Sequence, residues 1–168
     1  MNLRFPESQI IEIAKRYNDP LDDKVMSFKE TIQTKGYIDK DQLKLVAKWK
    51  APRSAGRIEN NTDSYIKEIT SFAFSAKDER SRIEILTILS GVAWPTASVL
   101  LHLYHKDKYP ILDFRALWSA NSLIQNQYNF GFWEEFISFC REIAVRNQTS
   151  MRTLDRAMWQ YSKENQKA

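Results

Sequence analysis

The chain has a single cysteine, Cys140, among its 168 residues. One thiol excludes an internal disulfide, a four-cysteine zinc site and a four-cysteine iron–sulfur cluster. Its apolar neighbours Phe136, Ile137 and Ile143 indicate that this thiol is buried in a helix. Small folds that depend on a disulfide framework or an iron–sulfur cluster are therefore excluded.

Long hydrophobic runs are also lacking, since no stretch of 18 apolar residues occurs. The first turns of the chain carry charged side chains such as Arg4, Glu7 and Arg16, where a signal peptide would be apolar. We therefore expect neither a membrane span nor a signal peptide, and a cytoplasmic location.

Glycine and proline are scarce, with four and five residues respectively, and apolar residues between them recur at steps of three and four. This spacing predicts amphipathic helices, and Asp39 and Gln42 have capping-box spacing ahead of one of them. The segments with helical spacing are 10–17, 22–34, 43–50, 66–73, 83–89, 99–103, 116–123, 133–143 and 151–161. We predict an all-α fold, a compact bundle of about eight helices in one domain over residues 1–168, with two small lobes around a shared core as the alternative.

Cations exceed acids by four, with 25 Lys and Arg against 21 Asp and Glu. This excess favours an anionic partner without identifying it. The segment 48–57, KWKAPRSAGR, combines four of the cations with one indole. Its cations would contact phosphates, and Trp49 or Arg53 would stack on an unstacked base. Alternatively, the segment is a solvated helix end whose Trp49 anchors the core. Trp118, Trp133 and Trp159 are expected in the core.

Residues 89–98, LSGVAWPTAS, predict a tight connection between two helices. Gly91 permits a backbone angle that most residues avoid, and Pro95 suits the first turn of the second helix. The turn would expose backbone N–H groups, which together with the helix dipole attract an anion such as a DNA phosphate. Considered alone, such a turn is most often an ordinary helix–helix connection.

The turn and the segment 109–117, YPILDFRAL, together resemble the helix-hairpin-helix DNA glycosylase superfamily. In that superfamily the hairpin reads Leu-Pro-Gly-Val-Gly-x-Lys-Thr-Ala, and a catalytic aspartate follows in a Val-Asp-Thr-x-Val-like segment. The interval between the two motifs also matches, and the resemblance covers about residues 80–125, with the hairpin at about 86–105. The matching positions are Leu89, Gly91, Val92, Thr96, Ala97, Leu112 and Asp113.

The resemblance implies a small, monofunctional, cluster-free glycosylase that flips a damaged or modified base out of duplex DNA and leaves an abasic site. Asp113 would be its catalytic residue, because an ionised carboxylate beside the anomeric carbon favours an oxocarbenium-like transition state. No organic cofactor is implied, although the superfamily allows an alkali ion held by the hairpin backbone. We expect a monomer that binds double-stranded DNA and no membrane.

The hairpin departs from the superfamily pattern at two positions. Ala93 stands where the second glycine is usual, so the turn must accept a Cβ there. Pro95 stands where bifunctional members carry a nucleophilic lysine, so coupled strand cleavage is not expected. The resemblance places DNA contacts at Gly91, Val92, Ala93, Trp94, Thr96, Lys106 and Lys108.

Other interpretations of the same residues stay open. Aspartate is a preferred N-cap, so Asp113 alone predicts a helix start as readily as a catalytic group. The chain would then be a noncatalytic DNA-binding module, or a helical protein-interaction domain whose basic loop binds an acidic partner. Within the glycosylase interpretation, base-excision repair and defence against phage DNA with hypermodified bases are both compatible. His102 and His105 lack a third ligand at a convincing spacing, so no catalytic metal is expected.

Overall fold

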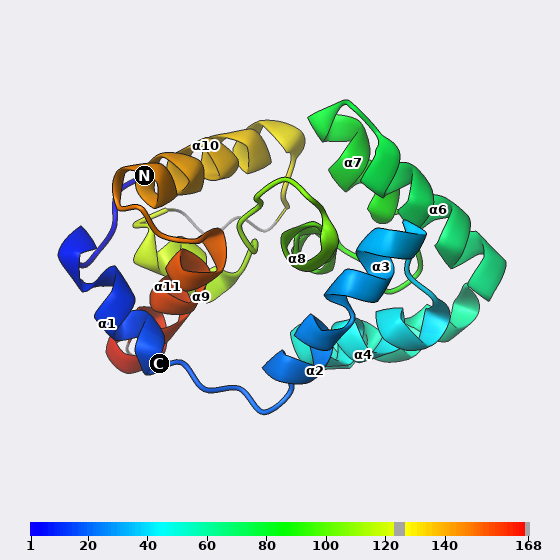
Figure 1. Cartoon of the computed structure of the whole chain (residues 1–168), viewed down its shortest axis with the longest axis horizontal. Helices are drawn as coiled ribbons and strands as arrows, with labels where there is room; N and C mark the ends of the chain where they lie inside the picture. The colour runs from blue at the N-terminus through cyan, green and yellow to red at the C-terminus, as the bar shows by residue number, and fades with distance from the viewer. Residues whose placement is uncertain (123–126, 167–168) are drawn as a thin grey trace. The chain divides into compact units, whose positions relative to one another are not determined.

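The computed structural model describes residues 1–122 and 127–166, which form eleven α-helices, two short 3-10 helices and no strand (Figure 1). The predicted all-α fold is confirmed. Among these residues no helix has both the length and the apolar character that crossing a membrane requires.

The number of helices exceeds the prediction because one predicted helix is divided and because the four-residue helix α5 (Pro52–Ala55) was not predicted. The range 22–34, predicted as one helix, is two helices that meet at Phe28. The helix predicted at 116–123 instead spans Phe114–Ser119, and Leu123 lies outside the described residues.

The chain divides into two compact units, one of Met1–Asp19 with Lys108–Ala168 (unit 1) and one of Pro20–Asp107 (unit 2). Unit 1 is therefore built from the two ends of the chain, and unit 2 from its middle. The expectation of a single domain over residues 1–168 stays a prediction, because two groups of residues that contact mainly one another can still belong to one domain.

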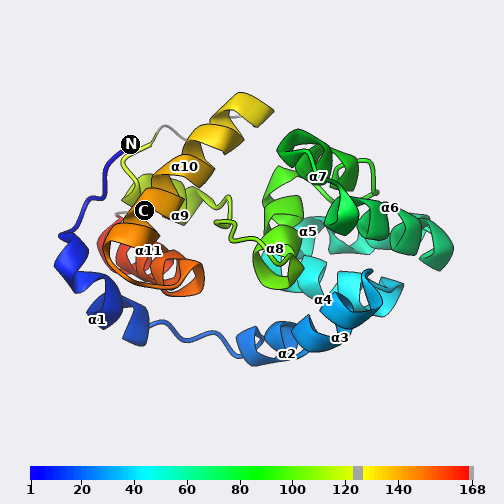
Figure 2. The ribbon, with the colours of Figure 1, turned by 45° about the horizontal axis from the view of Figure 1, so that its top comes forward.

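Unit 2 is organised around one buried helix, α8 (Trp94–Tyr104), which packs against α3, α4 and α7 within the unit (Figure 2). Every residue from Thr96 to Leu101 is buried, so α8 is enclosed on all sides. The other elements of unit 2 are α2 (Asp22–Ser27), α3 (Lys29–Lys35), α4 (Lys40–Lys50), α5 (Pro52–Ala55), η2 (Gly56–Asn60), α6 (Asp63–Ser75) and α7 (Glu79–Leu86).

Polar side chains fix the starts of the longer helices of unit 2. Asp39 and Gln42 form the predicted capping box at the start of α4, with each side chain accepting a hydrogen bond from the other residue's backbone N–H. Thr62 is the N-cap of α6 and Asp78 is the N-cap of α7. The side chain of each accepts one hydrogen bond from a backbone N–H of the first turn. These caps satisfy N–H groups that the helices themselves leave unpaired.

Unit 1 contains η1 (Glu7–Gln9), α1 (Ile10–Lys15), α9 (Phe114–Ser119), α10 (Phe130–Arg146) and α11 (Met151–Asn165). Helix α11 packs against α1, α9 and α10, so the first and last helices of the chain lie side by side. Trp133 and Phe136 of α10 are fully buried. Cys140 is buried beside them, as predicted, and burial raises the pKa of its thiol.

Two ion pairs join the N-terminal segment to the C-terminal helices of unit 1. Arg16 donates from Nε and Nη2 to the two carboxylate oxygens of Glu164, at 2.9 and 2.8 Å. Glu7 accepts hydrogen bonds from Arg146 and Asn147 at the end of α10. The hydrogen bonds from Arg16 and Arg146, respectively, are the main reason why the pKa values of Glu164 and Glu7 fall from 4.5 to about 2.

These lowered pKa values predict a loss of stability in acid. A carboxyl with a folded-state pKa near 2 and an unfolded-state pKa of 4.5 stabilises the fold fully above pH 4.5. That contribution is lost as the pH falls from 4.5 to 2. Arg16→Gln should therefore reduce the drop in the free energy of unfolding between pH 6 and pH 2, measured by denaturant titration followed by circular dichroism. Lys15→Gln, which removes another cation of the same segment, should leave the drop unchanged. An equal drop in the parent and Arg16→Gln would contradict this assignment.

Candidate functional site

The connection between α7 and α8 has the predicted backbone geometry. Helix α7 ends at Leu86 and α8 begins at Trp94, with Pro95 in its first turn. Gly91 has φ of +84°, a left-handed angle that residues with a Cβ rarely adopt. The sequence thus predicted correctly why glycine and proline occupy these two positions.

Asn61 holds the middle of this connection in place. Its side-chain Nδ2 donates to the carbonyl of Ser90 at 3.0 Å and to the carbonyl of Ile58 at 3.1 Å, while its Oδ1 accepts from the N–H of Ser90 at 2.9 Å. The amide therefore pairs with both backbone polar groups of Ser90, as a neighbouring strand would. Asn61 is itself 5% exposed, so losing these bonds would leave buried polar groups unpaired.

The backbone of Gly91 also packs tightly against unit 2 itself. A Cβ at this position would lie 3.0 Å from the carbonyl oxygen of Ser54 and 3.0 Å from the side chain of Ile58. The close approach that requires glycine is therefore an approach to other residues of the protein itself. Any side chain at position 91 would strain the turn before it affected a bound ligand.

The backbone N–H groups that follow Gly91 are the ones an anion could use. Ala93 is exposed, has extended backbone angles and provides no side-chain cap for α8. Within residues 1–122 and 127–166, no acceptor pairs with the N–H groups of Ala93, Trp94 and Thr96. The side chains of Val92 and Thr96 are buried, so any contact that they make with DNA would be through the backbone.

Asp113 lies in unit 1, where it is the N-cap of α9. Its Oδ1 accepts a hydrogen bond of 2.9 Å from the backbone N–H of Arg115, as predicted for an aspartate at a helix start. The side chain is half-buried. This hydrogen bond pairs one of the backbone N–H groups that the start of α9 would otherwise leave unpaired.

The segment that leads to Asp113 is anchored by aromatic stacking. The ring of Tyr109, fully buried, stacks on Trp133 of α10 with the centroids 6.1 Å apart and the planes within 14°. The guanidinium of Arg141 lies 5.1 Å from the Tyr109 ring centroid, and its Nε donates to the carbonyl of Lys108 at 2.9 Å. These contacts tie the start of the segment that leads to α9 to helix α10.

Tyr128 is a residue near Asp113 that the sequence did not indicate. Its hydroxyl pKa is raised by burial and further by the negative charge of Asp113, which places the two side chains in one electrostatic neighbourhood. Its ring packs on Phe132 at 5.8 Å between centroids. No spacing or motif links positions 113 and 128, so only the fold reveals this neighbour.

The two predicted DNA-binding lysines are both exposed, Lys106 at the end of unit 2 and Lys108 at the start of the second segment of unit 1. His105, which follows the last residue of α8, is buried, and its Nδ1 accepts the backbone N–H of Asp107 at 3.0 Å. Burial, and then the cation of Arg82, lower the pKa of His105. Within the described part of the chain, no three His, Cys, Asp or Glu side chains gather where they could hold a metal ion.

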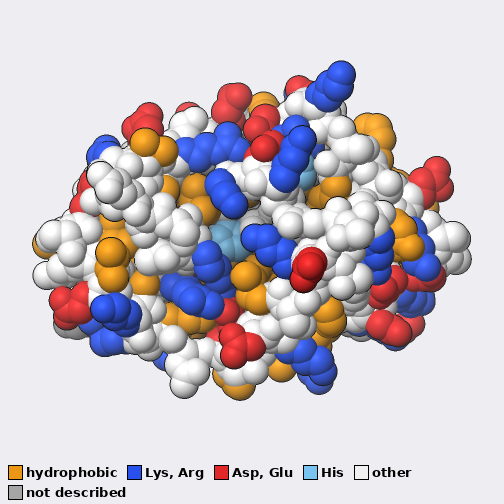
Figure 3. All heavy atoms as spheres, in the orientation of Figure 1, with side chains coloured by type: hydrophobic (Ala, Val, Ile, Leu, Met, Phe, Trp, Pro, Cys, Tyr) orange, Lys and Arg blue, Asp and Glu red, His pale blue; other side chains and the backbone are white. Residues whose placement is uncertain are grey.

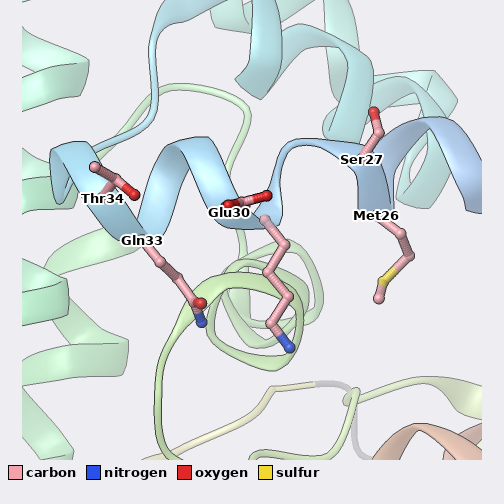
Figure 4. A pocket seen from close by; sticks show the side chains of 6 residues that line it. Met26, Ser27, Glu30, Gln33 and Thr34 are labelled. Carbon is pink, nitrogen blue, oxygen red and sulfur yellow. The ribbon is translucent and has the colours of Figure 1, made fainter.

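Trp49 and Arg53 are the predicted base-pocket residues, on α4 and α5. Trp49 is half-buried and Arg53 is exposed. They line neither of two surface depressions in unit 2. One depression, of about 480 Å³, lies along α2 and α3 and is lined by Met26, Ser27, Lys29, Glu30, Gln33 and Thr34 (Figure 4). The other, of about 340 Å³, lies near the C-terminal ends of α3, α6 and α8 and includes Phe74, Tyr104 and His105.

The predicted residues thus fall into two groups, each within its own unit. Unit 2 contains residues 91–96 of the connection between α7 and α8, and unit 1 holds Asp113 with Tyr128 and α9. Lys and Arg side chains are visible on the face drawn in Figure 3, with Asp and Glu among them. No protein-family model, no curated protein and no solved structure matches the chain.

The pairing of Asn61 with Ser90 predicts a local effect of Asn61→Ala. The variant should lose about 1–3 kcal/mol of stability, because buried backbone groups lose their partners. Native-state hydrogen exchange should show faster exchange of the Ser90 amide in particular.

Thr70→Val provides a matched control for this prediction. Thr70 is fully buried in α6, where its Oγ1 accepts from the N–H of Ile38 at 3.0 Å and donates to the carbonyl of Ile66 at 2.8 Å. This variant also loses buried hydrogen bonds of unit 2. It should not speed up hydrogen exchange of the Ser90 amide more than exchange of the neighbouring amides. If both variants changed Ser90 exchange equally, Asn61 would have only a general role in stability.

Proposed function

We propose that this chain is a monofunctional DNA N-glycosylase, which hydrolyses the bond between a flipped base and its sugar and leaves an abasic site. The observation that carries the proposal is the order of two features along the chain. A turn with a left-handed Gly91 leaves N–H groups at the start of α8 without an acceptor in the described part of the chain, and the next helix, α9, has a half-buried Asp113 as its N-cap.

The carboxylate of Asp113 would act on the sugar. As the bond from the anomeric carbon to the base nitrogen breaks, its electron pair leaves with the base and the sugar becomes positively charged. An ionised carboxylate nearby stabilises that charge. A water molecule then forms the new bond to the anomeric carbon, and Asp113 accepts its proton. The N–H of Arg115, which already bonds to Oδ1, would keep the carboxylate ionised and oriented before reaction.

The hairpin would hold the DNA backbone. The N–H groups of Ala93, Trp94 and Thr96 at the positive end of the α8 dipole favour a phosphate oxygen. Lys106 and Lys108 are exposed cations that would add phosphate contacts. Trp49 and Arg53 remain candidates for stacking on the flipped base.

The product would be an intact strand with an abasic site. Pro95 has no amine, so the hairpin offers no nucleophile for a Schiff base at the position where bifunctional members of the superfamily carry lysine. The target base is damaged or hypermodified, and both base-excision repair and defence against modified phage DNA are consistent with this chemistry.

A second function is favoured by one specific observation. Because Asp113 already serves as the N-cap of α9, its presence is explained without catalysis. A noncatalytic hairpin module would bind duplex DNA through the same N–H groups and release no base. A helical protein-interaction domain would show no strong salt dependence of duplex binding.

Asp113→Asn separates catalysis from capping. The amide keeps the shape and the capping oxygen but loses the negative charge, so base release should fall by about 100-fold or more while helix content stays the same. The measurement is single-turnover release from a duplex on which the parent is active.

Asp78→Asn is the matched control, because Asp78 caps α7 through the same kind of bond to a backbone N–H, in this case that of Ser81. It should release the base at the parental rate. A parental rate in Asp113→Asn would assign Asp113 to capping alone.

A further inference from the structure

The connection between α7 and α8 packs against a second segment of unit 2, which consists of α5 and η2. A Cβ on Gly91 would lie 3.0 Å from the carbonyl oxygen of Ser54 and 3.1 Å from the backbone nitrogen of Ile58. Asn61, directly after η2, holds the backbone of Ser90 through its side-chain amide. The two segments are therefore neighbours at both ends of η2.

This second segment places two arginines beside the connection. Its backbone angles stay right-handed helical where α5 passes into η2, so the segment is one continuous helical stretch. Ser54 and Ile58, about one turn apart, both lie against Gly91. The residues directly before them are Arg53 and Arg57, so both arginines flank the connection. Both are exposed.

The two segments that meet here contain cations and no acid. Residues 48–58 include two lysines and two arginines without an Asp or Glu. Residues 87–104, which hold the connection and α8, contain no Lys, Arg, Asp or Glu. The charge beside the connection is therefore set by the cations of 48–58, unless acids of neighbouring elements neutralise it.

The acids of the neighbouring elements lie close to cations other than these two arginines. The pKa of Lys44 is raised chiefly by its hydrogen bond to Glu59 and also by the charge of Asp41. In the part of the chain that the structure describes, no oxygen accepts a hydrogen bond from the guanidinium of Arg53 or Arg57. The ion pairs are Lys35–Asp39 at 2.8 Å, Lys40–Glu59 at 3.1 Å, Lys44–Glu59, Lys67–Asp63 at 2.5 Å and Arg80–Glu84 at 2.9 Å.

We infer that Arg53 and Arg57, here named the arginine pair, bind phosphates of the DNA strand that the connection would hold. The inference rests on the DNA binding of the proposed function, but not on its chemistry. A guanidinium suits a phosphate because it donates two parallel hydrogen bonds to its oxygens. A DNA strand carries one phosphate per about 3.4 Å of rise, so two arginines one turn apart meet a regular row of charges.

The exposure of Arg53 favours a phosphate over the base that the sequence suggested for it. An enzyme that flips a base encloses it in a snug pocket. Arg53 is exposed and lines neither of the two depressions of unit 2. The sequence gave no reason to single out Arg57, because only the packing of Ile58 against Gly91 places it beside the connection.

The test uses Arg53→Gln, Arg57→Gln and the double variant of the full chain. Because both side chains are exposed, the variants should keep the parental helix content, which circular dichroism measures. Affinity for a short unmodified duplex is measured at several salt concentrations. Each lost phosphate contact should reduce the steepness of log K against log salt by about 0.9, so the double variant should lose about two.

The matched control is the double variant Lys44→Gln with Lys67→Gln. It removes the same charge from unit 2, but these two ammonium groups already pair with Glu59 and Asp63. It should keep the parental slope. An equal loss of slope in this control would assign the effect to net charge and overturn the inference.

Three further results would also overturn the arginine pair. They are a parental slope in Arg53→Gln or Arg57→Gln, a parent without salt-dependent binding to the duplex, and a double variant that loses affinity for polyglutamate but keeps the parental DNA slope. The last result would indicate that the pair binds an acidic protein instead.

The outcomes for the arginine pair and for catalysis are distinguishable. A slope that falls as expected, in a chain that releases no base from any duplex, would support the arginine pair and refute the glycosylase proposal. Base release at the parental rate together with the parental slope in the double variant would do the opposite.

Discussion

The hydrogen bonds between the side chain of Asn61 and the backbone of Ser90 are the constraint on which the connection between α7 and α8 depends. A turn between two helices leaves several polar backbone groups without helical partners, and here one buried amide pairs with two of them. Gly91 then turns with a left-handed angle against Ser54 and Ile58, and α8 begins without a side-chain cap. Among the residues that the structure describes, no acceptor pairs with the N–H groups of Ala93, Trp94 and Thr96 at the start of α8, where a phosphate would be favoured.

In unit 1 the corresponding constraint is the packing of Tyr109 between Trp133 and Arg141. It ties the chain to α10 shortly before α9 begins, so Asp113 is presented from a fixed segment. The N–H of Arg115 then orients the carboxylate.

The sequence predicted the features that depend on local geometry. The all-α class, the capping box at Asp39, the angle at Gly91 and the cap at Asp113 all follow from residue preferences over a few positions. It did not predict Asn61 or Tyr128, because their partners lie far away in the chain and their residue types occur in many loops. The break at Phe28 was also missed, since apolar spacing continues across it.

The most direct measurement of the central claim is base release from a panel of duplexes that carry damaged or hypermodified bases. Free base would be detected by mass spectrometry, and the strand would be analysed before and after alkali and after borohydride treatment. A monofunctional glycosylase should release a free base from at least one duplex, leave the strand intact until alkali is added, and form no borohydride-trapped adduct, since Pro95 offers no amine. Release of no base from any duplex would contradict the proposed activity, and a trapped adduct with strand breaks before alkali would contradict hydrolysis by water beside Asp113.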